Sequence, residues 1–411
     1  MSLTISVPDS LRASVEGASG GKQTVLYTAL GQPTFMNVTP AMVGANIVSG
    51  LSANLNSLAT NTHPAFVVGG VAKSEIFIGT YPGIVLNGEL LSLPGVDPSH
   101  TLNHDQFVAY ARACGTGYHV CTNAEYAALA LWCRANSYQP TGNSNYGASS
   151  DRAWESGRRV DGLAPGTASG NARVITGSGP NSWNHDNSPN GIDSLCGNIW
   201  EWSIGARVNS GEINIITDNN GALNATDLAA GSASWKAIDG ATGALVAPGT
   251  AGTVRLATSG TTNYTLVCGS GSPFEGMTNP GGTPVGATAL ALCKAHGFYP
   301  VASQLGGTIA TPAANGDGFY LDAAIEALPF RGGYWSDAAV AGVFGLNCDF
   351  VRTYANTNIG ARPDSKPRTL QKDCGLKGGA FPHLARAFAK SAGHLFTSRH
   401  HVVLDRLEVI L

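Results

Sequence analysis

The sequence has few charged residues and no dense run of like charges. Only 12% of its 411 residues are Asp, Glu, Lys or Arg, about half the usual share, which excludes a coiled coil and a charged disordered chain. The 24 basic and 27 acidic residues give a formal net charge of −3. No basic run is dense enough to follow a phosphate backbone, so we expect no nucleic-acid partner.

Long hydrophobic runs are also missing. No stretch approaches the roughly 18 apolar residues that a membrane helix needs. The N-terminal residues MSLTISVP lack a basic region followed by an apolar core, which is the pattern of a secretory signal. We therefore expect no membrane insertion, and synthesis in the cytoplasm without a signal peptide.

The eight cysteines are dispersed, and no two of them form a C-x-x-C pair. Such pairs mark zinc sites and redox dithiols, so neither is expected, and the spacing predicts no metal site. In a reducing cytoplasm the cysteines act as small buried hydrophobic residues. We predict six or more free thiols.

One loop is rich in oxygen-bearing side chains, namely those of Asp186, Asn187, Asn190 and Asp193. Side-chain and carbonyl oxygens in this number could bind Ca²⁺. Asx turns that stabilise the loop explain the same residues equally well. Calcium is therefore an open alternative, and no other cofactor is expected.

The changes of composition along the chain predict an α+β protein. Residues 1–72, rich in Ser, Ala, Gly and Asn, are interpreted as an N-terminal accessory or docking segment. The alternation after Lys73 predicts a strand that begins the main domain, 73–362. Low-charge residues at about 206–275 predict an insertion of hairpins, and 363–411 form a C-terminal tail.

Three helices have clear local signals. Apolar residues recur at helical spacing over 104–114 and over 286–296, and a glycine follows each segment. Thr122 and Glu125 have the spacing of a capping box, in which each side chain binds the other residue's backbone N–H. The sequence therefore predicts a helix that begins after Thr122.

Four segments with distinctive composition occur in a fixed order: 118–126 (YHVCTNAEY), 191–202 (GIDSLCGNIWEW), 331–335 (RGGYW) and 358–362 (NIGAR). Together they resemble the C-type lectin fold of the formylglycine-generating-enzyme type. The resemblance covers residues 73–362. It implies a fold with little regular structure, in which Trp200, Trp202 and Trp335 pack the centre and Glu201 and Arg331 make buried polar contacts.

The sulfatase-activating members of that family oxidise a substrate cysteine with a cysteine pair that follows the third motif. Here the corresponding positions are Asp337 and Gly342, and the nearby thiol is Cys348. No histidine cluster that could hold iron lies in the motif-bearing region. We therefore expect no enzyme and no catalytic residue, and keep a formylglycine-generating-type oxidoreductase as an alternative.

Residues 331–347 and 356–362 also resemble the variable region of proteins diversified by retroelements. In that family a reverse transcriptase miscopies template adenines and rewrites codons on the ligand-binding face of the lectin fold. The resemblance implies a variable region at about 331–362. It implies ligand-binding positions at Tyr334, Ser336, Asp337, Val340, Asn347, Asp349, Phe350, Tyr354, Asn356 and Thr357.

Two observations support these ten positions. Rewriting the adenines of an AAC codon yields residues such as Asn, Tyr, Ser, Asp, Val, Phe and Thr, and all ten residues obey that limit. Rigid aromatic and small polar side chains are also typical of an antibody-like binding surface. A solvated loop without selectivity is the competing interpretation.

The resemblance implies a hypervariable receptor-binding or adhesion protein encoded by a phage or prophage. Its partner would be a protein or glycan ligand on a target cell surface, and it would be located on a virion or a cell. In many family members the variable region lies at the C-terminus, whereas this chain continues to residue 411. A fixed structural virion or surface protein is a further alternative, and the ligand and oligomeric state stay open.

Overall fold

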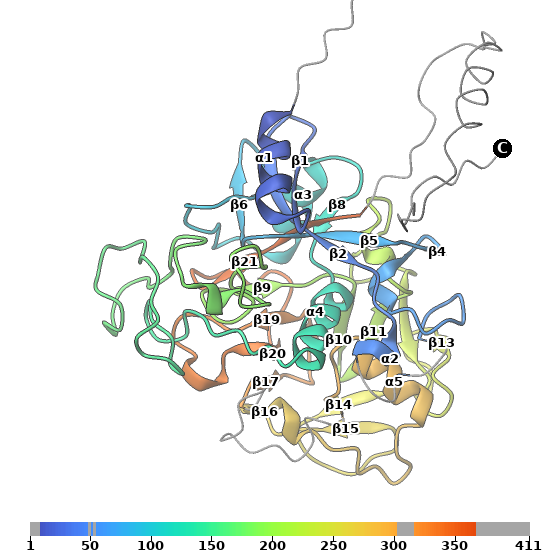
Figure 1. Cartoon of the computed structure of the whole chain (residues 1–411). Helices are drawn as coiled ribbons and strands as arrows, with labels where there is room; N and C mark the ends of the chain where they lie inside the picture. Colours follow the sequence, from blue (N-terminus) through green and yellow to red (C-terminus); the bar gives the residue numbers. More distant parts are fainter. Residues whose placement is uncertain (1–8, 48–50, 52–54, 302–315, 367–411) are drawn as a thin grey trace, which may run out of the picture. The chain divides into compact units, whose positions relative to one another are not determined.

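The computed structural model describes residues 9–47, 51, 55–301 and 316–366. These residues form three large β-sheets, two hairpins and five α-helices, which confirms the predicted α+β class. Figure 1 labels the elements along the chain. The C-terminal tail from residue 367 lies outside the described residues, as does Cys374.

The α-helices are α1 (Ser10–Ser19), α2 (Gly44–Ile47), α3 (His104–Ala113), α4 (Asn123–Ala135) and α5 (Ala287–Ala295). Short 3-10 helices are η1 (Pro64–Phe66), η2 (Asn181–Trp183), η3 (Asn220–Ala222), η4 (Phe274–Gly276) and η5 (Ala338–Val340). All three predicted helices are present, as α3, α4 and α5. The predicted capping box is confirmed, because the Thr122 hydroxyl accepts from Glu125 N and the Glu125 carboxylate accepts from Thr122 N.

The first sheet has the strand order β1-β2-β5-β22-β8. Its strands are β1 (Gln23–Tyr27), β2 (Pro33–Pro40), β5 (Glu75–Gly79), β22 (Pro363–Ser365) and β8 (Tyr118–Val120). All four pairings are antiparallel. The sheet therefore continues across both predicted domain boundaries, at residues 72 and 362, and the accessory role of the N-terminal segment stays a prediction.

The second sheet contains most of the predicted insertion. Its strands are β13 (Leu245–Val246), β12 (Trp235–Ile238), β11 (Glu212–Ile216), β10 (Ala206–Asn209), β18 (Glu326–Ala327), β14 (Arg255–Ala257) and β15 (Thr265–Val267). Successive strands from β10 to β13 are joined as antiparallel pairs, as expected for hairpins. Strand β18 pairs with β10 and joins this sheet to the segment that precedes the variable-type block.

The third sheet has the order β16-β17-β20-β19-β9-β21. Its strands are β16 (Ser272–Pro273), β17 (Gly318–Leu321), β20 (Gly342–Cys348), β19 (Phe330–Gly332), β9 (Trp200–Trp202) and β21 (Ile359–Ala361). Strand β9 contains Trp200 and Trp202 of the second motif. Two hairpins complete the strands: β3 (Val67–Val68) with β4 (Val71–Ala72), and β6 (Gly83–Leu86) with β7 (Glu89–Ser92).

Helix α4 lies at the centre of the main hydrophobic core. Ten of its residues are buried, and it contacts α2, α5 and β20. A second core cluster lies around Trp200 and Trp202 and includes Phe330. The seven described cysteines are free and buried, which confirms the prediction of at least six free thiols. No helix in the described ranges is long and apolar enough to cross a membrane.

Candidate ligand-binding surface

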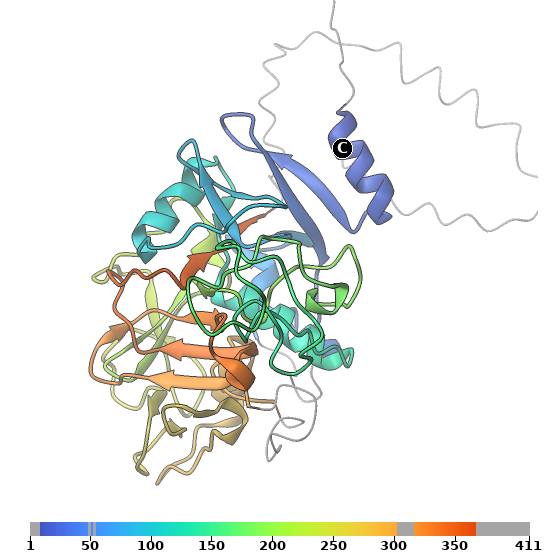
Figure 2. The same cartoon turned by 90° about the vertical axis from the view of Figure 1, so that its left-hand side faces the viewer.

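The variable-type block, 331–362, contributes three strands of the third sheet and the two loops between them. One loop, 333–341, joins β19 to β20, and the other, 349–358, joins β20 to β21. In Figure 2 the orange and red part of the chain, which contains these elements, faces the viewer. We call these two segments the first loop and the second loop.

The scaffold residues under the loops are buried, as the family resemblance implies. Trp200, Trp202 and Trp335 are only 4%, 0% and 6% exposed. Glu201 and Arg331 face each other in register on β9 and β19. Their side chains nevertheless hydrogen-bond to other residues: Arg331 to Asn123, and Glu201 to Arg362.

Two buried arginines connect the motifs. Arg331 Nε donates to Asn123 Oδ1 at 2.8 Å, which joins the third motif to the start of α4. Arg362 Nε and Nη2 donate to the two oxygens of Glu201 at 3.0 and 2.6 Å. The four sequence motifs therefore contribute to a network of buried polar contacts around the third sheet.

The first loop depends on backbone geometry that glycine allows. Gly332 and Gly333 have φ values of +90° and +89°, and a Cβ on Gly333 would lie 2.6 Å from that of Ala341. Asp337 Oδ2 then accepts a hydrogen bond from Tyr334 N at 3.0 Å. The Tyr334 ring meets Trp335 edge-on at 5.2 Å. Among the predicted site residues, those of this loop are all half-buried: Tyr334, Ser336, Asp337 and Val340.

The second loop presents aromatic and polar side chains together. The rings of Phe350 and Tyr354 are stacked, with centroids 4.0 Å apart and planes 14° apart. Asn356 is exposed, and its Nδ2 donates to the Tyr354 hydroxyl at 3.0 Å. Thr357 N donates to Asn356 Oδ1 at 2.7 Å. These contacts hold the polar groups at the edge of the aromatic pair.

An aromatic series connects the second loop to the core. The ring centroids of Phe350 and Phe330 are 5.6 Å apart, and those of Phe330 and Trp202 are 4.0 Å apart. Phe330 and Trp202 are both fully buried, whereas Phe350 and Tyr354 are half-buried. The rings of Phe350 and Tyr354 can therefore contact a ligand, while the buried rings beneath them hold the two rings in position.

Asn347 differs from the other nine predicted positions because it is only 5% exposed. It lies in the middle of the third sheet, opposite Phe330 on one side and Tyr320 on the other. Its Oδ1 accepts from Asp349 N at 3.1 Å. The side chain therefore shapes the start of the second loop from inside the sheet.

Tyr320 of β17 is not among the ten ligand-binding positions predicted from the sequence. This half-buried tyrosine meets Trp200 edge-on at 6.3 Å. Burial raises its pKa, and so do the charges of Asp337 and Asp349, one from each loop. Tyr320 therefore stands near both loops. The alternation with buried Phe319 in a short strand was the available signal, because it places Tyr320 on the opposite face of the sheet, where it packs against the cluster around Trp200.

Burial changes the acidity of the carboxyl groups at this surface. It raises the pKa of Asp337 to about 7, and it also raises the pKa of Asp349. Behind the first loop, burial raises the pKa of Asp317 to about 7, and its Oδ2 accepts from Phe344 N at 2.7 Å. Near neutral pH, Asp337 can thus accept or donate a hydrogen bond.

Of the two positions that correspond to the cysteine pair, Gly342 has no room for a side chain. A Cβ on Gly342 would lie 2.1 Å from Asp317 Oδ1. The nearby thiol of Cys348 is fully buried, and burial raises its pKa to about 12. A thiol with this pKa is protonated at neutral pH and is a poor ligand for copper.

The oxygen-rich loop is closed by its own hydrogen bonds. Asp186 Oδ1 accepts from Ser188 N at 3.0 Å, and Asp186 Oδ2 lies 3.5 Å from Lys22 Nζ. Asp193 is buried and accepts from Gly177 N at 3.1 Å. The two carboxylates therefore bind separate groups of the protein, as Asx-turn stabilisation predicts. Calcium binding stays an untested alternative.

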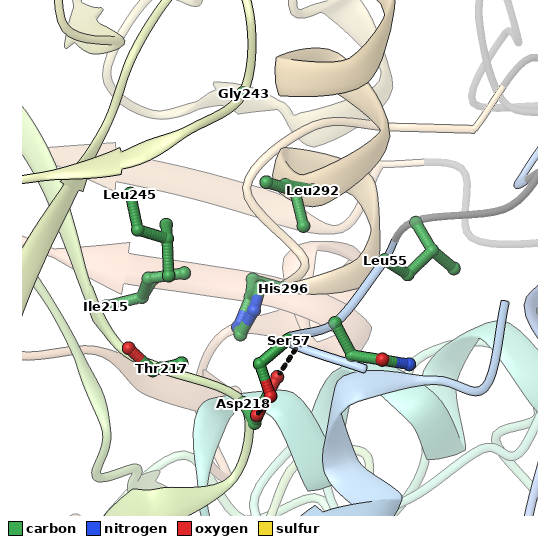
Figure 3. A pocket seen from close by; sticks show the side chains of 10 residues that line it. Leu55, Ser57, Ile215, Thr217, Asp218, Gly243, Leu245, Leu292 and His296 are labelled. Atoms are coloured by element: carbon green, nitrogen blue, oxygen red, sulfur yellow. Dashed lines mark hydrogen bonds between the residues drawn. The ribbon is translucent and has the colours of Figure 1, made fainter. Parts of the chain in front are cut away.

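Figure 3 shows a cavity of about 130 Å³ that is lined by other elements. Leu245 and Leu292 form part of its apolar wall, and His296 and Asp218 lie at its polar end. None of its lining residues belongs to the block 331–362. Its volume is below the roughly 300–1,000 Å³ of ordinary ligand pockets.

The fold and the surface thus define an α+β protein in which two loops display aromatic and acidic side chains over a buried tryptophan and arginine scaffold. No family model and no curated protein matches the chain. Among solved structures, the chain is similar to Treponema denticola variable protein 1, with a TM-score of 0.32, 10% identity, and coverage of 84% of this chain and 99% of that one. It is also similar to the Major Tropism Determinant U1 variant, with a TM-score of 0.29, 12% identity, and coverage of 81% and 63%. Likeness at this level does not fix the fold family.

Proposed function

We propose that the chain is a ligand-binding protein for receptor recognition or adhesion, and that its two loops form the binding surface. Its fold would be a C-type lectin fold of the formylglycine-generating-enzyme type, with the block 331–362 diversified by a retroelement. The observation that carries the proposal is the separation of the block into two sets. Apart from Tyr334 and Asn358, the residues of the four motifs are buried, whereas nine of the ten variable-type positions lie in the loops and are half-buried or exposed.

This separation is what a diversified binder requires. A side chain can change without unfolding the protein only where little of its surface is buried, because burial couples it to its neighbours. Exposed Asn356 meets that condition, whereas buried Trp202 and Arg331 do not. Asn347 is assigned the supporting role of shaping the second loop.

The chemistry of the surface suits a protein or glycan ligand. Stacked Phe350 and Tyr354 provide rigid contact area, and the hydroxyl, amide and carboxyl groups around them provide hydrogen bonds. The proposal assigns binding, and no catalytic step, to this surface. Multivalent display on a virion or a cell would raise a weak affinity of each single site.

Sequencing many copies of the gene from a population of its source tests the proposal. Codons 325–370 should carry substitutions concentrated at template adenines of the ten positions. The codons of the buried strand β9 (Trp200–Trp202) serve as the matched control and should stay unchanged. An invariant block would instead favour a fixed structural virion or surface protein.

A further inference from the structure

Three ionisable side chains meet inside the first sheet, away from the two loops. His119 lies on β8, and Asp364 lies directly opposite it on β22 in the antiparallel register. Glu125 comes from the first turn of α4. One ligand atom from each residue lies within 4.8 Å of the others, and no side chain of the three is more than 1% exposed.

The histidine ring has the orientation of a metal ligand. Its Nδ1 lies 3.0 Å from the Gly117 carbonyl oxygen, which can only accept, so Nδ1 carries the proton. In the neutral ring Nε2 then has a free lone pair, and it points at both Glu125 oxygens at 3.0 Å. A lone pair that faces a carboxylate is unfavourable unless a proton or a cation lies between them. Metal-bound histidines usually donate their other N–H to a carbonyl or carboxylate in this way.

The glutamate is held in place by outer contacts. Thr122 N donates to Glu125 Oε2, and Asn219 Nδ2 donates to Glu125 Oε1, both at 2.8 Å. Neither donor belongs to the cluster itself. Second contacts of this kind fix the orientation of a ligating carboxylate.

The aspartate has one oxygen satisfied and one left over. Gly79 N donates to Asp364 Oδ1 at 3.0 Å. No N–H or O–H among the described residues donates to Asp364 Oδ2, although the atom is buried. The Cys121 thiol faces this carboxyl, but burial and the charges of Asp364 and Glu125 raise the pKa of the thiol, which is a weak donor. An unpartnered carboxylate oxygen in a buried cluster is costly without a counter-charge.

The salt-bridge contact of the cluster is internal, because His119 Nε2 lies 3.0 Å from Glu125 Oε1. Arg362 lies two residues from Asp364, but its guanidinium donates to Glu201, the Gly79 carbonyl and the Asp193 carbonyl. With His119 neutral and both carboxyl groups ionised, as a metal site requires, the cluster would have a formal charge of −2. One divalent cation would balance that charge and satisfy the free oxygen at the same time.

We propose that His119, Glu125 and Asp364 form a buried structural site for one zinc ion. Imidazole nitrogen and carboxylate oxygen are both zinc donors, and water takes the fourth position where the protein provides three ligands. Zinc also exceeds manganese and ferrous iron in affinity for nitrogen and oxygen ligands of this kind. The site is closed, so the ion enters while the chain folds.

A zinc ion here would connect β22 to β8 and to the start of α4. Strand β22 directly follows the block 331–362. The ion would thus fix the end of the block in the scaffold, whatever side chains the loops carry. The site does not depend on the proposed binding function, since none of its ligands belongs to that surface.

The test uses the full chain, unfolded in denaturant with a chelator and then refolded with either zinc or chelator. Elemental analysis after gel filtration should find one zinc per chain in the first sample. The zinc-refolded protein should melt at least about 5 °C higher than the chelator-refolded one. Asp364→Asn keeps the shape of the side chain and should reduce the zinc content at least about tenfold. Asp186→Asn, in the oxygen-rich loop, is the matched control and should bind as much zinc as the wild type.

Wild-type protein that takes up no zinc on refolding, or that melts at the same temperature after refolding with zinc and with chelator, would overturn the proposal. So would an Asp364→Asn variant with unchanged zinc content. If that variant does not fold, the zinc content and the zinc-dependent melting of the wild type decide the question. Failure of this test leaves the binding function untouched, because sequencing of the gene measures the latter separately.

Discussion

Arg362 and Glu201 form a buried ion pair that joins the fourth sequence motif, 358–362, to strand β9. Two guanidinium nitrogens donate to the two carboxylate oxygens, and further guanidinium N–H groups donate to the carbonyls of Gly79 and Asp193. One side chain thereby connects the first and third sheets. The third sheet carries the candidate binding surface, so this ion pair stabilises the strands on which the surface is built.

Replacing Arg362 with lysine should destabilise the protein by about 3–5 kcal/mol, because an ammonium group cannot satisfy the carboxylate and both carbonyls at once. Denaturant unfolding measures the change. Arg12→Lys is the control, since Arg12 pairs with Asp9 at the surface with 41% of its side chain exposed. That change should cost less than about 1 kcal/mol. Equal losses in the two variants would mean that the buried pair has no special role.

Alanine substitutions of Phe330 and Tyr354 should destabilise the protein to different extents, because Phe330 lies in the core and Tyr354 lies at the surface. Phe330→Ala removes a fully buried ring that contacts Trp202 and should cost about 3–5 kcal/mol. Tyr354→Ala removes a half-buried ring stacked on Phe350 and should cost about 1 kcal/mol. Urea unfolding curves of the two variants provide the comparison. A larger loss for Tyr354→Ala would show that the second loop is part of the core.

Gly342→Ala should destabilise the chain by about 2–3 kcal/mol, since the new methyl group would overlap the Asp317 carboxylate. Gly231→Ala meets no atom within 4 Å and should change stability by less than about 0.5 kcal/mol. The double variant Gly342→Ala, Asp317→Ala should be more stable than the sum of the two single changes predicts. Strict additivity in thermal melts would refute the contact between the two positions.

Asp317→Asn should change how stability depends on pH. Burial raises the pKa of Asp317 from 3.8 to about 7, so the folded protein holds this proton more tightly than the unfolded chain does. The stabilisation is complete below pH 3.8 and is lost as the pH rises towards 7. Asparagine does not ionise and can still accept from Phe344 N. The melting temperature of the variant relative to the wild type should therefore rise between pH 4 and pH 7.5, and a constant difference would contradict the shift.

Local sequence signals predicted the elements that depend on near neighbours. The Thr122 and Glu125 capping box defined the start of α4, because both hydrogen bonds of the box lie within one turn. The burial of Trp200 and Trp202 also followed from the motif in which they occur. The placement of the variable-type residues in two loops agrees with their mixed polar and aromatic character.

Local sequence signals could not predict contacts between segments that are distant in the chain. Asn347 has the residue type of the variable positions, yet a central strand buries it, because neighbouring strands cover both of its edges. Tyr320 was missed because its strand is only four residues long, too short for a clear periodicity. The pairing of β2 with β5 likewise crosses a change in composition that had suggested a boundary at residue 72.

The sequence by itself determined the low charge, the helix starts and the ordered motifs, since each depends on composition or on residues close together in the chain. Only the tertiary structure decided that Asp364 faces His119, although the two residues are 245 positions apart in the sequence. No spacing rule reports such a meeting, because strand register brings the two residues together. The same holds for Arg362 and Glu201, whose buried charges are stable only where the fold excludes water and provides every hydrogen-bond partner.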